Sequence, residues 1–75
     1  MRICIEERDQ AHVDGHTVRR GEVVAVNGTD RRGHPSRVHG RVVRIREAVD
    51  RATGAADFIL VSVLTFESIR RVVRI

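Results

Sequence analysis

Residues 57 to 65, Asp-Phe-Ile-Leu-Val-Ser-Val-Leu-Thr, are the stretch of this chain that decides its fold. Almost every position is apolar, which is typical of a β-strand whose two faces are both covered. Alternation along the strand separates two apolar sets: Phe58, Leu60, Leu64 and Phe66 on one face, and Ile59, Val61 and Val63 on the other. We expect both phenylalanines to be buried.

A chain of 75 residues has little material with which to cover both faces of this strand. A domain of this size buries only about 60% of its unfolded surface. Leaving three branched side chains in water forfeits several kcal/mol at about 25 cal/mol per Å². Residues 47–56 could cover this face, but they offer mainly Ala48, Val49 and Ala52. A second copy of the chain is the better candidate, so the sequence predicts that Ile59, Val61 and Val63 form an interface between copies, with a twofold dimer as the default.

Further strands are predicted on both sides of this stretch, at residues 2–6, 22–26, 37–47 and 69–75. Asp14-Gly15 is a strong signal for a two-residue hairpin turn. Gly40 and the adjacent Val42 and Val43 indicate a bulge or sharp bend.

The sequence predicts one structure for the first connecting segment and two alternatives for the second. Residues 27–36, Asn-Gly-Thr-Asp-Arg-Arg-Gly-His-Pro-Ser, contain several breakers of regular structure, and we expect an exposed, mobile loop there. Residues 47–56 fit two alternatives, a short helix over 47–54 or a long hairpin loop.

Together these elements predict a single small β domain over residues 1–75. The expected fold class is mainly β, as a five-stranded SH3-like or Sm-like barrel or a strongly bent antiparallel sheet.

Every basic side chain except histidine is an arginine, and the charges are unevenly distributed. Residues 1–30 carry four arginines and six acidic residues, whereas residues 31–75 carry ten arginines and four acidic residues. Codon usage in a GC-rich genome would explain the absence of lysine, but it does not explain this asymmetry. Arginine suits phosphate because its planar guanidinium stays charged and binds through two N–H groups.

Eight arginines in and around the predicted loop and strands are the candidate nucleic-acid contacts: Arg31, Arg32, Arg37, Arg41, Arg44, Arg46, Arg70 and Arg74. Contacts of this kind provide affinity for phosphate without selecting bases. A solvated basic face with no ligand is the competing interpretation. A buried location for both phenylalanines would leave no platform for stacking bases.

Catalytic and metal chemistry has little support in the sequence. His12, Asp14 and His16 resemble a zinc site only if the segment is extended, and the Asp14-Gly15 turn argues against that. Cys4 and Ser62 are expected to be a packing residue and a hydrogen-bonded hydroxyl. The sequence has no cofactor fingerprint, so we expect no cofactor, no metal and no enzymatic activity.

Two short stretches are similar to a known family of small barrels. Residues 20–26, Arg-Gly-Glu-Val-Val-Ala-Val, resemble the opening of MazF-like ribonuclease toxins, which are SH3-like barrels, and residues 68–72 are similar to a strand near their interface. The similarity covers scattered short stretches, and no catalytic residue is carried over from it.

The cysteine content and the length of the apolar runs indicate the cellular compartment in which the protein acts. The single cysteine cannot form an internal disulfide, which favours a reducing, cytoplasmic setting. No signal-peptide pattern is present, and the apolar run at 58–64 is far shorter than the roughly 20 residues that span a bilayer. We expect a cytoplasmic binding module for nucleic acid, with a homo-oligomeric protein-interaction module as the alternative.

Overall fold

The computed structural model describes residues 2–75, and this part of the chain contains seven strands and no helix. The strands are β1 (Ile3–Arg8), β2 (Gln10–Val13), β3 (His16–Arg19), β4 (Val23–Thr29), β5 (Pro35–Asp50), β6 (Ala56–Thr65) and β7 (Arg70–Arg74). The mainly-β class and the antiparallel pairing are confirmed. No helix of the described chain is long and apolar enough to cross a membrane.

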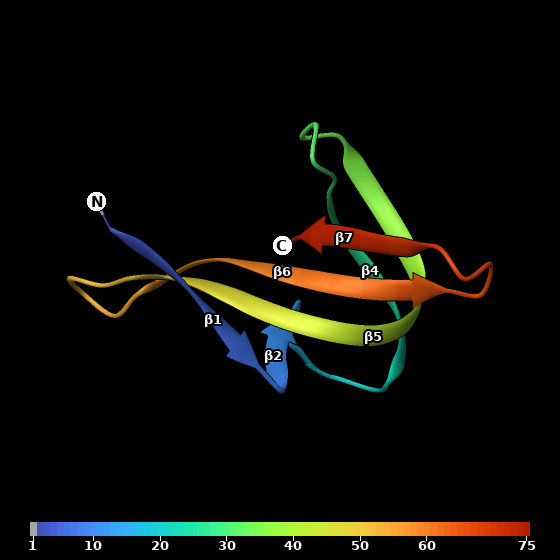
Figure 1. The fold of residues 1–75 in the computed structure, drawn as a ribbon, viewed down its shortest axis with the longest axis horizontal. Coiled ribbons are helices and arrows are strands. Elements are labelled where there is room, and N and C mark those ends of the chain that lie inside the picture. The colour runs from blue at the N-terminus through green and yellow to red at the C-terminus, as the bar shows by residue number, and fades with distance from the viewer. Residues whose placement is uncertain (1) are drawn as a thin grey trace.

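Five of the strands form one sheet in the order β1-β5-β4-β7-β6, and β6 also pairs with β5. The pairings thus pass from β5 through β4, β7 and β6 back to β5, with β4 and β7 joined at Thr29 and Arg74. Figure 1 shows β5 as a long curved ribbon that leaves β4 at one end and runs between β1 and β6 at the other. β2 and β3 form a separate hairpin.

The curvature of β5 has two local causes, both indicated by the sequence. Gly40 lies where β5 passes from β4 to β6, and a Cβ atom there would overlap the carbonyl oxygen of Leu64. The register between β5 and β6 then shifts between Val42 and Arg44. Val43 is therefore the extra residue of a bulge, which bends the strand. The predicted bend is confirmed.

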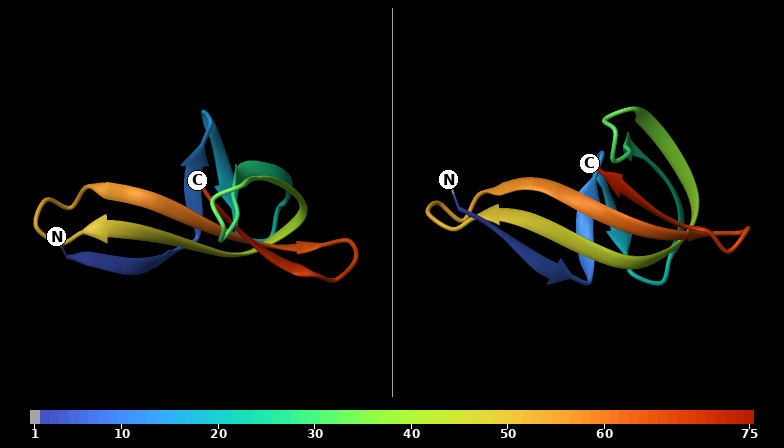
Figure 2. Two further views of the ribbon diagram at one scale, coloured as in Figure 1. Left: turned by 90° about the horizontal axis from the view of Figure 1, so that it is seen from above. Right: turned by 45° about the horizontal axis from the view of Figure 1, so that its top comes forward.

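The core lies on the inner face of the bent sheet, and the β2–β3 hairpin covers it. Figure 2 shows this hairpin standing on one side of the long β5–β6 ribbon. Its Ala11, Val13 and Val18 belong to the same buried cluster as Val61 and Val63. Asp14 and Gly15 turn the hairpin with positive φ angles of 49° and 79°, so the predicted hairpin is confirmed.

The chain itself therefore covers the strand face that the sequence analysis left open. Val61 and Val63 are 0% exposed, and Ile59 packs partly buried against the core. The expectation that this face is uncovered in a single chain is wrong, because the β2–β3 hairpin and inward residues of β4, β5 and β7 enclose it.

Both connecting segments also differ from expectation. β4 continues through Gly28 and β5 begins at Pro35, so the loop between them is residues 30–34 and not 27–36. Gly28 is required in the strand, because a Cβ atom there would overlap the Arg74 carbonyl oxygen and Val73 Cγ1. The helix over 47–54 is wrong: strand β5 runs to Asp50, and a tight turn follows in which the Gly54 N–H donates to the Asp50 carbonyl at 2.7 Å. The alternative of a hairpin connection is correct, but the loop is residues 51–55 and not 47–56.

Candidate nucleic-acid interface

The eight arginines proposed from the sequence do not form one continuous surface. Some are engaged by other groups of the fold, and others converge with Arg71 on an open cavity. The arginines without such contacts mark the candidate site.

Arg44 is bound by a carboxylate. Its Nε donates to Glu7 Oε1 at 2.7 Å, and its Nη2 forms an ion pair with the same oxygen. The hydrogen bond from Arg44 lowers the pKa of Glu7, and Glu7 in turn raises the pKa of Arg44. Because Glu7 already compensates its charge, Arg44 is a less favourable candidate for a phosphate contact than the sequence suggested.

Arg46 lies on the same strand in a more enclosed setting. It is opposite Glu7 on β1 and Leu60 on β6, and its side chain is half-buried. Its Nε is buried without a hydrogen-bond partner among the described residues. This position favours packing within the sheet over contact with a ligand in solvent.

Arg74 and Arg41 also contact other parts of the fold. The Arg74 guanidinium carbon lies 3.9 Å from the centroid of the Phe58 ring, a cation–π contact. The Arg41 Nη1 donates to the carbonyl oxygen of Gly21 at 2.6 Å. Both side chains are exposed, but each already has a partner.

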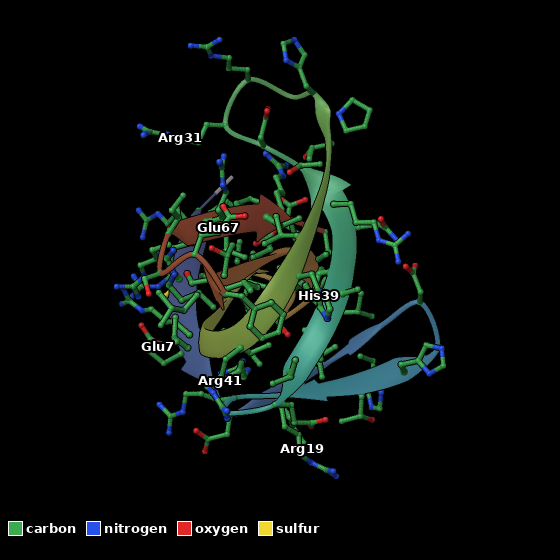
Figure 3. The ribbon with its side chains drawn as sticks, turned by 90° about the vertical axis from the view of Figure 1, so that its right-hand side faces the viewer. Glu7, Arg19, Arg31, His39, Arg41 and Glu67 are labelled. Carbon is green, nitrogen blue, oxygen red and sulfur yellow. The ribbon has the colours of Figure 1, made fainter. Side chains whose placement is uncertain are left out.

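Four arginines line one cavity at the end of the fold where β7 begins. Arg31 and Arg32 come from the β4–β5 loop, and Arg70 and Arg71 from β7; we call these four residues the arginine cluster. The cavity measures about 390 Å³ and is also lined by Asp30 and His34. In Figure 3, Arg31 extends from the loop on the side where Glu67 marks the β6–β7 turn.

Within residues 2–75, the guanidinium groups of the arginine cluster form no ion pair, although the charge of Asp30 attracts that of Arg32. The ion pairs of this part of the chain join Arg8, Arg20 and Arg44 to carboxylates elsewhere. All four residues are exposed. Four positive charges around one open cavity favour an anionic ligand.

The loop that carries Arg31 and Arg32 is held by Asp30. Asp30 Oδ1 accepts hydrogen bonds from the backbone N–H groups of Arg32 at 2.9 Å and His34 at 3.0 Å. The bond from the His34 N–H lowers the pKa of Asp30, and the Arg32 N–H adds to this effect. The carboxylate thus orders the loop that presents the two arginines.

Sequence reasoning missed Arg71 and misplaced Phe66. Arg71 pairs with Val63, on the same face as the buried Val73, and alternation alone would place it inward. At the start of β7 that face opens onto the cavity. Phe66 was expected to be buried, but it is 71% exposed because β6 ends at Thr65 and Phe66 enters the turn.

A second cavity of about 440 Å³ adjoins the first and shares Ser36 and Arg71 with it. Arg37, His39, Phe66 and Glu67 are among its lining residues. The His39 and Phe66 rings lie 5.1 Å apart at an interplanar angle of 88°, in an edge-on contact. Arg37, proposed from the sequence, therefore lies beside the aromatic pair and not in the arginine cluster.

Among residues 2–75, no group of three His, Cys, Asp or Glu side chains is arranged to hold a metal ion. His12 pairs across the hairpin with Thr17, whose Oγ1 is 3.2 Å from His12 Nδ1. Cys4 is a half-buried free thiol. Ser62 Oγ is buried without a hydrogen-bond partner in the described chain, so the expectation of a bonded hydroxyl is wrong.

Comparison of the chain with protein-family models, with curated proteins and with solved structures finds no match. The short stretches similar to MazF-like toxins therefore carry no family assignment, and the functional argument rests on the site itself.

Proposed function

We propose that this protein is a small, non-enzymatic module that binds nucleic-acid phosphates through the arginine cluster. The observation that carries the proposal is the convergence of four exposed, unpaired arginines from two elements on one cavity. Guanidinium groups bind phosphate oxygens through paired N–H donors and stay charged at every physiological pH. The net charge of +4 supports attraction of a polyanion from a distance.

The fold that presents this site is proposed to be a small barrel of the SH3-like or Sm-like kind. The pairings that return from β5 through β4, β7 and β6 to β5 support this description. In such a barrel the β4–β5 loop and the start of β7 meet at one open end. Phosphate contacts there would position a nucleic acid without reading its bases.

The test is a binding titration with a labelled oligonucleotide at low salt, read by fluorescence anisotropy. Replacing Arg31 and Arg70 by Gln should weaken binding at least about tenfold, since one hydrogen bond to a charged group contributes about 1.5–3 kcal/mol. The control is Arg2→Gln with Arg51→Gln, which removes the same charge from a residue before β1 and a residue of the β5–β6 turn, neither of which lines the cavity. Figure 1 shows the N-terminus and this turn at the opposite end of the β5–β6 ribbon from the start of β7. Equal effects of the two double variants, or no binding by the wild type, would refute the proposal.

Self-association is a second candidate function, and the edge strand β1 favours it. β1 pairs with β5 alone, and its Ile3 and Ile5 are 39% and 49% exposed. The Arg51 N–H donates to the Arg2 carbonyl at 3.0 Å. The alternation of antiparallel bonding then leaves the N–H and C=O groups of Ile3 and Ile5 at the open edge.

Two copies of β1 are complementary in one antiparallel register. With Cys4 opposite its counterpart, Ile3 faces Ile5 and Arg2 faces Glu6 of the second copy, pairing apolar with apolar and positive with negative. This interface would replace the one predicted at Ile59, Val61 and Val63. Sedimentation at micromolar concentration tests it, and a single species of 8.5 kDa would rule it out.

A further inference from the structure

We infer that the cavity beside the arginine cluster takes a base of a single-stranded nucleic acid, stacked on Phe66. This inference rests on the proposed function and specifies its ligand. The arginine cluster supplies the phosphate contact, and the adjoining cavity supplies the contact with the base.

Phe66 is presented to solvent by a fixed turn. It is the most exposed of the large apolar side chains, at 71%. The Ser68 N–H donates to the Thr65 carbonyl at 2.9 Å, and the Thr65 N–H donates to the Ile69 carbonyl at 2.9 Å. Ser68 has a φ of 62°, in the region that residues other than glycine seldom adopt. The turn thus holds an aromatic ring outside the core, in a conformation set by its own hydrogen bonds.

The surroundings of Phe66 suit a flat, uncharged ring. The His39 and Phe66 rings are perpendicular to each other, and with 71% of Phe66 exposed most of its surface is open to a third ring. Aromatic side chains of this kind stack with any base, because every base has a π-face. Two perpendicular rings also restrict the orientation that the bound base adopts.

The two cavities differ in the groups that they offer to a nucleotide. The first is lined by the four arginines of the cluster and by Asp30. The second has two arginines, Arg37 and Arg71, beside Glu67, and it alone contains the His39–Phe66 ring pair. The Glu67 carboxylate can accept a hydrogen bond from an N–H group of a base. Arg71 and Ser36 line both cavities, so a phosphate in the first and its base in the second require no gap in the strand.

This arrangement favours single strands over duplexes. Bases in a duplex are stacked and paired inside the helix, whereas unpaired bases turn outward onto protein rings. A duplex would reach the arginine cluster with its phosphates and leave Phe66 unused.

The test compares a labelled oligothymidylate with an abasic strand of the same length, which keeps the phosphates and lacks the bases. The wild type should bind the oligothymidylate at least about fivefold more tightly, the lower limit for stacking of one base. Phe66→Leu should abolish this preference and leave affinity for the abasic strand unchanged, which also shows that the variant is folded. Ile69→Ala, a change to another exposed apolar residue of the same turn, should keep the preference.

The other outcomes separate the inference from the proposed function. Equal wild-type affinity for both strands overturns the stacking inference and leaves phosphate binding in place. A preference for bases that survives Phe66→Leu also overturns it, because the platform would then lie elsewhere. Failure to bind either strand at low salt refutes the proposed function and the inference with it.

Discussion

Removal of charge from the arginine cluster should change the salt dependence of binding by a calculable amount. If each of the four arginines neutralises one phosphate of a single strand, the slope of log K against log salt is about −2.8, at about −0.7 per phosphate. Raising salt from about 50 to about 200 mM then weakens binding by about 50-fold. Replacing Arg31 and Arg70 by Gln leaves two contacts, a slope of about −1.4 and a loss of about sevenfold over the same range.

The assay is anisotropy of a labelled oligothymidylate at several salt concentrations. The matched control is Glu7→Gln with Arg44→Gln, which removes an ion pair and keeps the net charge. Because the Arg44 charge is already compensated by Glu7, this control should keep the wild-type slope. A slope that flattens in the control, or that stays unchanged in the Arg31 and Arg70 variant, would refute the assignment of phosphate contacts to the cluster.

Three further changes test other features. Ser62→Ala should raise the free energy of unfolding by about 1 kcal/mol, because it removes a buried hydroxyl that lacks a partner; a loss of stability in urea unfolding would show that the hydroxyl is bonded. Asp30 has a lowered pKa, so its contribution to stability is complete above its ordinary pKa near 3.9 and is lost as pH falls through the folded value. Asp30→Asn should remove this acid-dependent part of the stability profile below the ordinary carboxyl pKa near 3.9, and an unchanged profile would contradict the role given to the carboxylate. If copies pair through β1 with Cys4 opposite Cys4, oxidation should yield a disulfide-linked dimer on a non-reducing gel, because Cα atoms in such a pair lie about 4.5 Å apart; a protein that sediments as a dimer but never cross-links would exclude this register.

Local sequence features predicted the parts of the fold that local interactions determine. Period-two alternation located the main strands, Asp14-Gly15 located the hairpin turn, and Gly40 marked the bend in β5. Each depends on the conformational preferences of a few adjacent residues. The cover of the inner face was not predictable, because the β2–β3 hairpin packs there through contacts between distant segments.

The sequence predicted that the candidate site is rich in arginine, but it did not predict which arginines form the site. Counting charges identified an arginine-rich half, but it did not show which guanidinium groups are free. Arg44 is compensated by Glu7, far away in sequence, and Arg71 reaches a cavity that the β4–β5 loop helps to form. Gly28 is another residue whose role depends on a distant segment. Asn27-Gly28 is typical of a turn, but in the structure Gly28 lies within a strand, where the close approach of β7 leaves no room for a Cβ atom.

The position of β5 at the centre of the pairing scheme affects how the chain assembles during synthesis. β1 and β4 both depend on β5 for their antiparallel partner, and β5 follows them in the sequence. Until β5 has been made, the β2–β3 hairpin is the pairing available to the described residues, and an isolated hairpin is marginally stable. The growing chain must therefore keep its first two sheet strands unpaired until β5 emerges, and the core, which includes Val73, can close only after both β6 and β7 have been made.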